Sequence, residues 1–432
     1  MKIYIKFSLV LGLLCLVGQL WAQVPMPAPE QQFPVYIVNG TVHVGNGEVL
    51  ENGIVAFENG KITIVATPET LGKVNLSRYQ IIDAKGKHVY PGFIAPNTNL
   101  GLVEIGAVRP TRDNRETGPV NPNVRSIIAY NTDSEVIPTI RSRGVLLAQI
   151  TPEGGLVSGM SSIVHLDAWN WEDAAIVTDD GIHMNWPTTY SYNWRRRQVS
   201  RNDRYGEQVD QIDQFMAEAK AYTNNKDLTE TNLKFEAMRP LFSKERQLFI
   251  HVSNAKSMTT AILMAKKYNL KAVIVGGSDA WMITDLLKEN NIPVILSRPH
   301  RLPTQVDEDI DQPFKTPALL AEAGVLFCLQ NEGNWQQRNL PFQAGHAVGF
   351  GLDYEKAVQS ISLNTAKILG IDDKVGSIAI GKDATLFIST GDALDMRSSD
   401  VEKAFIEGRS INLNNKQKGL YEKFKKKYEE KR

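Results

Sequence analysis

The chain has 432 residues, of which 42% are hydrophobic, a composition typical of a globular protein. This length is too great for one small core and fits either one large barrel or two domains. Lysine plus arginine equals aspartate plus glutamate at 48 each, so no overall field steers the protein toward nucleic acid or an acidic surface.

The N-terminus has the pattern of a secretory signal peptide over residues 1–22. Lys2 and Lys6 precede an apolar run, and Ala22 closes the segment. We therefore predict cleavage near Ala22 and export to the periplasm or the exterior. No membrane span is expected, because no later segment approaches the roughly 20 apolar residues that a spanning helix needs. Only Cys328 remains after cleavage, which excludes an intrachain disulfide.

The rest of the chain divides into segments that differ in composition and in hydrophobic pattern. Residues 23–32 are rich in proline and predict an extended linker. Residues 33–90 and 376–412 both show short β-rich runs, the first set punctuated by Asn-Gly and Gly turns. We expect these two ends to build one small composite β-sandwich domain. Residues 413–432 predict a basic helical tail, either a solvated face or a contact for an anionic surface.

The middle of the chain, residues 91–375, alternates apolar strand-like runs with amphipathic helices. Repeated units of this kind close most economically into a TIM-type (β/α)8 barrel, so we predict the α/β class. In such barrels the active site lies just past the C-terminal ends of the strands. The residues at those positions are Asn97, Asn99, His251, Ser253, Gly276, Ser278, Asp279, Arg298, His300, Gln330, Asn331 and Glu332.

The barrel opens with the stretch "PGFIAPNTNLG", residues 91–101, which ends in two asparagines. Asn97 and Asn99 are two residues apart, and such residues on a strand point the same way. The spacing therefore predicts two amides aimed at one place. The alternative is that both side chains only satisfy backbone groups at a strand end.

A β unit split between both chain ends, around a barrel that opens with Pro-Gly-Phe-Ile, resembles the amidohydrolase superfamily. The resemblance is greatest to its imidazolonepropionase-like branch, and it continues through "LNTAKILGIDDKVGSIAIGKDATLFI" and "DVEKAFIEGR" near the C-terminus. It implies a metal-dependent hydrolase that acts on carbon–nitrogen bonds of non-peptide or cyclic amides. It also implies an oligomer, because these enzymes commonly form them.

The resemblance also locates a metal site, which is degenerate in this chain. In active relatives the opening reads Pro-Gly-Phe-Ile-Asp-x-His-x-His, a further histidine follows a middle strand, and an aspartate ends the last strand. These positions fall on Asn97, Asn99, His251 and Glu332. The implied metal ligands are then His251 and Glu332, with weak donors at the two asparagines and Glu332 as the catalytic carboxylate. Because zinc-like ions prefer nitrogen donors, we expect at most one divalent metal, or none.

The substrate-binding candidates are polar residues near the predicted strand ends and on the loop after the first strand. Arg112 on that loop is suited to an anionic or zwitterionic ligand. The two implied metal ligands also have structural alternatives. His251 could be a hydrogen-bonded core histidine, and Glu332 could form an ion pair with Arg298. The full set of substrate-binding candidates is Asn97, Asn99, Arg112, Ser278, Arg298 and Asn331.

Three functions remain open on the sequence. The first is an exported hydrolase of carbon–nitrogen bonds. The second is a catalytically inactive pseudoenzyme that binds a small amide-like or peptide-like ligand. The third is a subunit that pairs with itself or with an active relative. Residues 185–204 mix aromatic and basic side chains as a nucleic-acid groove does, but export argues against that partner and favours a surface insertion.

Overall fold

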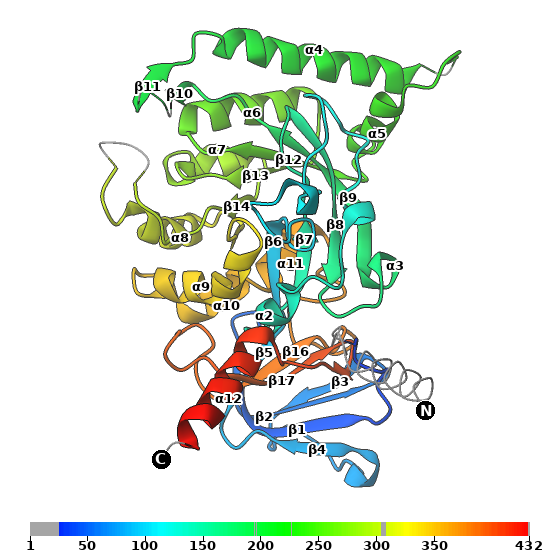
Figure 1. Cartoon of the computed structure of the whole chain (residues 1–432), viewed down its shortest axis with the longest axis vertical. Coiled ribbons are helices and arrows are strands. Elements are labelled where there is room, and N and C mark those ends of the chain that lie inside the picture. Colours follow the sequence, from blue (N-terminus) through cyan, green and yellow to red (C-terminus); the bar gives the residue numbers. More distant parts are fainter. Residues whose placement is uncertain (1–25, 194, 196, 226, 304–307, 431–432) are drawn as a thin grey trace, which may run out of the picture.

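The structure is a computed structural model that describes residues 26–193, 195, 197–225, 227–303 and 308–430. The predicted signal peptide lies outside these residues. Figure 1 shows a β-rich domain at one end of the molecule, a barrel in the centre and a long helix at the far end. Among the described residues, no helix is long and apolar enough to cross a membrane.

The β-rich domain is an eight-stranded sheet that both ends of the chain build together, as predicted. Strand β16 pairs antiparallel with β5, which joins the C-terminal segment to the N-terminal one. The strand order is β18-β17-β16-β5-β1-β2-β3, with β4 beside β1. The strands are β1 (Val35–His43), β2 (Val49–Glu58), β3 (Lys61–Ala66), β4 (Gln80–Asp83), β5 (His88–Pro91), β16 (Leu386–Ser389), β17 (Val401–Ile406) and β18 (Arg409–Ser410).

The central sheet is the predicted barrel, with one departure from the (β/α)8 pattern. Its order is β15-β14-β13-β12-β9-β8-β7-β6, and β8 runs antiparallel to both of its neighbours. The remaining pairs are parallel. The strands are β6 (Phe93–Thr98), β7 (Val145–Ile150), β8 (Val157–His165), β9 (Ala175–Asn185), β12 (Gln247–Val252), β13 (Ala272–Gly276), β14 (Val294–Leu296) and β15 (Phe327–Leu329).

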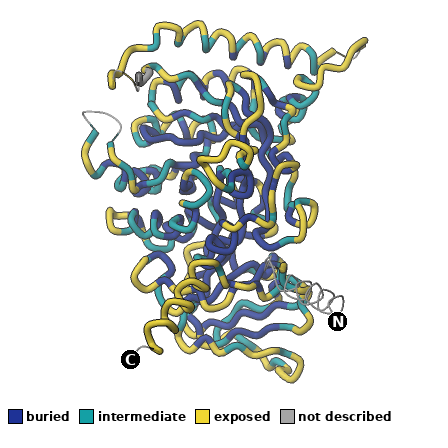
Figure 2. Tube along the Cα trace, viewed as in Figure 1, coloured by how far each residue is buried: buried dark blue, intermediate teal, exposed yellow. Residues whose placement is uncertain are grey.

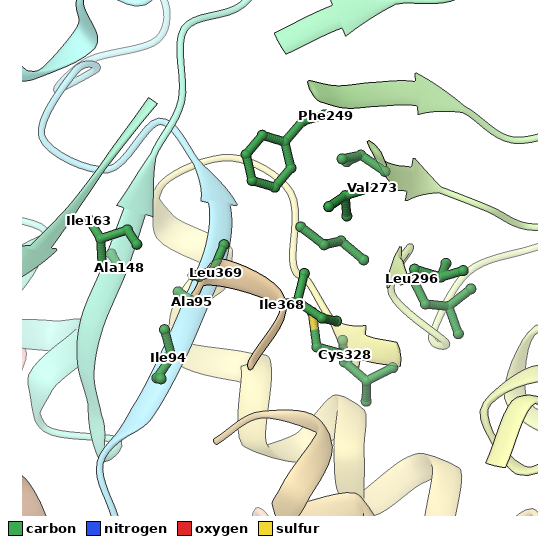
Figure 3. Packing of buried hydrophobic residues seen from close by; sticks show 14 of the residues in the cluster. Ile94, Ala95, Ala148, Ile163, Phe249, Val273, Leu296, Cys328, Ile368 and Leu369 are labelled. Atoms are coloured by element: carbon green, nitrogen blue, oxygen red, sulfur yellow. The ribbon is translucent and has the colours of Figure 1, made fainter. Parts of the chain in front are cut away.

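Buried apolar side chains fill the barrel and account for the continuous apolar runs of its strands. Figure 3 shows Ile94, Ala148, Phe249, Val273 and Leu296 gathered from different strands around this core. The thiol of Cys328 is buried in the same cluster. Burial of this kind contributes about 25 cal/mol for each Å² of apolar surface removed from water, which is why the barrel closes.

Helices cover the outside of the barrel. Helix α6 begins at its cap Asn254, whose side chain accepts a hydrogen bond from the backbone of Ser257, and buries one face against the strands. Helix α11 packs against both β15 and β6, the two ends of the sheet. The helices are α2 (Ile137–Arg141), α3 (Trp171–Ala174), α4 (Tyr205–Asn224), α5 (Leu233–Phe242), α6 (Ala255–Lys267), α7 (Thr284–Glu289), α8 (Gln312–Ala323), α9 (Leu340–Val348), α10 (Tyr354–Ser360), α11 (Leu363–Leu369) and α12 (Lys416–Glu429).

An insertion between β9 and β12 forms the far end of the molecule. It contains the hairpin of β10 (Tyr190–Asn193) and β11 (Gln198–Arg201), followed by α4 and α5. Helix α4 buries Ile212, Met216 and Ala219, which are spaced four and three residues apart and so share one face. Its other face is exposed, as is nearly all of α12 at the opposite end (Figure 2).

Candidate functional site

A cavity of about 390 Å³ opens where the parallel strands of the barrel end. Residues at or just after the ends of these strands line it, which is where ligand sites form in this architecture. The lining mixes amides, hydroxyls, two carboxylates and one imidazole. Its members are Asn97, Thr98, Thr151, Pro152, Glu153, Gly154, Asn185, Trp186, Pro187, Thr188, His251, Val252, Ser253, Asn254, Val275, Gly276, Ser297, Gln330, Glu332 and Gly333.

Asn97 sits at the cavity because the first barrel strand stops being regular there. Its φ is +48°, and the pairing of β6 with β7 shifts register between Ala95 and Thr98. Asparagine tolerates this left-handed conformation better than most residues. The side chain donates from Nδ2 to Oε1 of Gln330 at 2.6 Å, and its backbone N–H donates to Oε1 of Gln149 at 3.1 Å. Asn97 therefore ties the first barrel strand to the segment after the last one.

Asn99 does not line the cavity, because the break at Asn97 ends the alternation that would have aligned the two amides. Its Nδ2 instead donates to Oε1 of Glu153 at 3.0 Å, while Asn114 donates to Oε2 of the same carboxylate at 2.7 Å. Glu153 does line the cavity. The second asparagine thus orients the Glu153 carboxylate, which was not among the residues predicted from the sequence.

His251 is the imidazole at the cavity, and a chain of hydrogen bonds holds it from below. Its Nε2 lies 2.8 Å from Nδ1 of His183, whose Nε2 lies 2.9 Å from Oγ of Ser161. Ser161 donates to Oδ1 of Asp180 at 2.7 Å, and Gln149 donates to Oδ2 at 2.7 Å. This chain links a carboxylate inside the barrel to the imidazole at its mouth.

Burial determines the charge of these groups. Desolvation lowers the pKa of His251 to about 4, and it holds the pKa of His183 well below its usual range, with a further push from His251. Both imidazoles are therefore neutral near pH 7. Desolvation also raises the pKa of Asp180 to about 6, although its hydrogen bonds from Ser161 and Gln149 oppose the change.

The other predicted site residues divide into two groups. Glu332 lines the cavity and is exposed. Arg112, Ser278, Arg298 and Asn331 do not line it, although the last three lie close to strand ends.

Two of these residues have structural surroundings of their own. Asn331 is buried and donates to the carbonyl of Gln336 at 2.8 Å, so its amide belongs to the turn that follows β15. The ion pair of Arg298 with Glu332, considered from the sequence, does not occur between these two described residues. Glu332 is exposed to water and therefore does not need a buried counter-ion.

The donor set at the mouth does not fit a zinc-like centre. Such a centre needs three or four strong donors that converge on one point. In the described part of the chain, no group of three or more His, Cys, Asp or Glu side chains is placed to hold a metal ion. Nε2 of His251 is also engaged by His183, and the amide of Asn97 by Gln330. We therefore derive no chemical step through a metal.

Several lining residues were not singled out from the sequence. Glu153 closely follows the strand that ends "QITP", and its position after a strand was a usable signal. Asn185 ends β9 and Trp186 follows it, but the pattern of apolar runs did not predict this barrel strand, which pairs antiparallel with β8. The polar chain behind His251 could not be foreseen, because its members come from strands far apart in the sequence.

Comparison with known proteins agrees with this architecture. The model of the amidohydrolase family matches residues 249–411. The crystal structure of an amidohydrolase from Thermotoga maritima MSB8 superposes with a TM-score of 0.75 at 26% identity, covering 88% of this chain and 99% of that one. Residues 249–411 thus match the amidohydrolase family, and the chain shares the fold of an amidohydrolase.

Two other matches show less about this chain. Imidazolonepropionase from Bacillus cereus is 46% identical over 52 residues, a segment that spans only 12% of this chain and 12% of that relative. A Xaa-Pro dipeptidase with bound methionine has a TM-score of 0.54 at 15% identity, covering 88% of this chain and 100% of that one. The second match shows the fold alone. The resemblance drawn from the sequence is thus confirmed.

Proposed function

We propose that this amidohydrolase-like protein binds a small amide-like or peptide-like ligand at the mouth of its barrel. The observation that carries the proposal is the composition of the cavity, in which neutral amides and hydroxyls predominate around one neutral imidazole. An amide ligand presents one N–H donor and one C=O acceptor. A wall of side-chain amides and hydroxyls can pair with both, which a purely acidic or basic wall could not do.

The two carboxylates of the cavity give the ligand a direction. Glu332 is exposed at the rim, and Glu153 is fixed by Asn99 and Asn114. Carboxylates accept hydrogen bonds only, so they favour the N–H side of an amide or a ligand ammonium group. The amides of Asn97 and Gln330 lie on the same cavity and suit the carbonyl side.

Calorimetric titration of the purified chain with cyclic amides and dipeptide amides tests this proposal. We expect binding that weakens about tenfold or more in Glu332→Gln, because a charge-assisted hydrogen bond is lost. Glu322→Gln is the matched control, since Glu322 is exposed on α8 and lies outside the cavity. Absence of binding across the panel, or equal effects of the two substitutions, would overturn the proposal.

Hydrolysis of the bound carbon–nitrogen bond is the second candidate, and the presence of Glu153 and Glu332 on one cavity favours it. In this scheme Glu332 takes a proton from a water molecule as that water attacks the amide carbon, and the proton passes to the departing nitrogen. Product formation from the same panel, lost in both Glu332→Gln and His251→Ala, would support catalysis. Binding without product would support the ligand-binding function alone.

Export and self-association belong to the same proposal. The pattern of residues 1–22 supports export, and the expected partner in assembly is a second copy or a related amidohydrolase. Fractionation of cells that express the full chain tests the first point. Native mass measurement, alone and after co-expression with an active relative, tests the second.

A further inference from the structure

A second chamber adjoins the barrel-mouth cavity. It has a volume of about 660 Å³ and lies between the insertion helix α4 and the loops at the barrel mouth. Four residues border both spaces, namely Asn185, Trp186, Pro187 and Thr188. The remaining lining is Pro119, Val120, Gly155, Leu156, Asn202, Gln208, Gln211 and Phe215. We call this space the α4 chamber.

The wall shared by the two spaces is held in place from several sides. The backbone N–H of Trp186 donates to the carbonyl of His251 at 3.0 Å, and its indole N–H donates to the Tyr205 hydroxyl at 3.2 Å. Asn185 donates from Nδ2 to the carbonyl of Gly155 at 2.8 Å and to Oγ of Ser158 at 3.0 Å. A fixed wall of this kind separates two subsites instead of collapsing into either.

The two spaces differ in chemistry. The cavity at the barrel mouth carries His251, Glu153 and Glu332. Among the described residues that line the α4 chamber, none is ionisable, and its polar side chains carry neutral amides, one hydroxyl and one indole. Val120, Leu156 and Phe215 add apolar surface. Because no charged side chain lines the chamber, a charged group placed there would gain no direct ion pair from the lining, whereas an apolar group would gain from leaving water.

We propose that the α4 chamber binds an uncharged, apolar arm of the same ligand whose amide occupies the barrel mouth. This inference rests on the proposed function and specifies its ligand class: an amide with a polar head and a neutral hydrocarbon or aromatic arm. Because Asn185, Trp186, Pro187 and Thr188 line both spaces, the two spaces are neighbours, and one ligand that crosses this wall reaches both. The insertion of α4 then serves to recognise the ligand.

A graded ligand series tests the proposal. N-acyl glycinamides with acyl chains of increasing length all carry the same uncharged glycinamide head and differ only in the length of the hydrocarbon arm. Calorimetry with the full purified chain should show affinity rising about fourfold for each added methylene that becomes buried. A chain that ends in an ammonium group, such as 6-aminohexanoyl glycinamide, should bind more weakly than the hexanoyl compound.

Two matched variants of α4 locate the arm. Gln211 lines the α4 chamber and Gln214 does not, yet both are exposed, and each donates a hydrogen bond to a glutamate four residues away on the helix. Gln211→Trp should place a bulky ring in the chamber and reduce the gain from chain length, while acetyl glycinamide still binds as in the wild type. Gln214→Trp should change neither. Both substitutions sit on a solvent-facing side and spare the core.

The outcomes separate the two proposals. If acetyl glycinamide binds but lengthening the chain brings no gain, the α4 chamber holds no arm and only this inference is overturned. It is also overturned if Gln211→Trp and Gln214→Trp behave alike. If no glycinamide in the series binds at all, the ligand-binding function itself fails, and this inference fails with it.

Discussion

Nδ1 of His183 lies 2.8 Å from Nε2 of His251, and the two neutral rings are tilted by 52° to each other beneath the mouth of the barrel. His183 also stacks on Phe249, with ring centroids 4.6 Å apart and an interplanar angle of 10°. The imidazole that a metal would need is therefore fixed by a second imidazole. This pairing gives His251 one orientation toward a ligand and removes Nε2 from the donors available to a cation.

Ser161→Ala tests the polar chain behind His251. Ser161 joins His183 to Asp180, so its loss leaves a buried ring nitrogen and a carboxylate oxygen each short of one partner. Leaving such groups unsatisfied costs about 1–3 kcal/mol, and we expect a loss of about 2 kcal/mol in the free energy of unfolding, measured in urea. Ser243→Ala, at an exposed serine, should cost at most about 0.5 kcal/mol. Equal losses would show that the chain contributes no stability.

Asp180→Asn tests the electrostatics of the same chain. The pKa of Asp180 is raised to about 6 in the folded protein, so its contribution to stability is present below pH 3.8 and is lost as the pH rises through 6. Asparagine has no such loss, and the unfolding free energy of the variant relative to wild type should rise between pH 4 and pH 7 by roughly 1–3 kcal/mol.

The direction in which stability changes with pH distinguishes the contribution of Asp180 from that of the histidines. The pKa values of His183 and His251 are lowered by burial, so their contribution is present above pH 6.5 and falls as the pH drops toward 4. The wild type and Asp180→Asn share this histidine contribution, so it cancels when their unfolding free energies are subtracted. A difference that stays flat from pH 4 to pH 7 would contradict a desolvated carboxyl at position 180.

Asp167→Asn tests the junction between the barrel and the β-rich domain. The Asp167 carboxylate is buried and pairs with Arg141 of α2 and with Arg409 of β18, at 3.0 Å for Arg409. Removing its charge leaves two guanidinium groups without their counter-ion, which we expect to cost about 3–5 kcal/mol in thermal or urea unfolding. The control is Asp395→Asn, whose partner Arg397 is exposed, with an expected cost below about 1 kcal/mol. Similar costs for both would contradict the role of Asp167.

The sequence predicted the barrel, its opening strand and the shared β-rich domain, because periodicity and turn residues act locally. It did not predict that β8 runs antiparallel, since an apolar strand-like run does not show the direction in which a strand joins its sheet. The alternation of side chains along a strand predicted that Asn97 and Asn99 point the same way. This alternation holds only while the strand is regular, and Asn97 interrupts it with a φ of +48°. Contacts such as that of His183 with His251 depend on the closed barrel and leave no local signal.

The metal content of the purified chain tests the central claim most directly. The full chain should be expressed in zinc-supplemented medium, purified without chelators and examined by elemental analysis. Because the described barrel mouth offers His251 and Glu332 but no converging set of three strong donors, we predict zinc well below one ion per chain. One tightly held zinc ion per chain, lost in His251→Ala, would contradict the account.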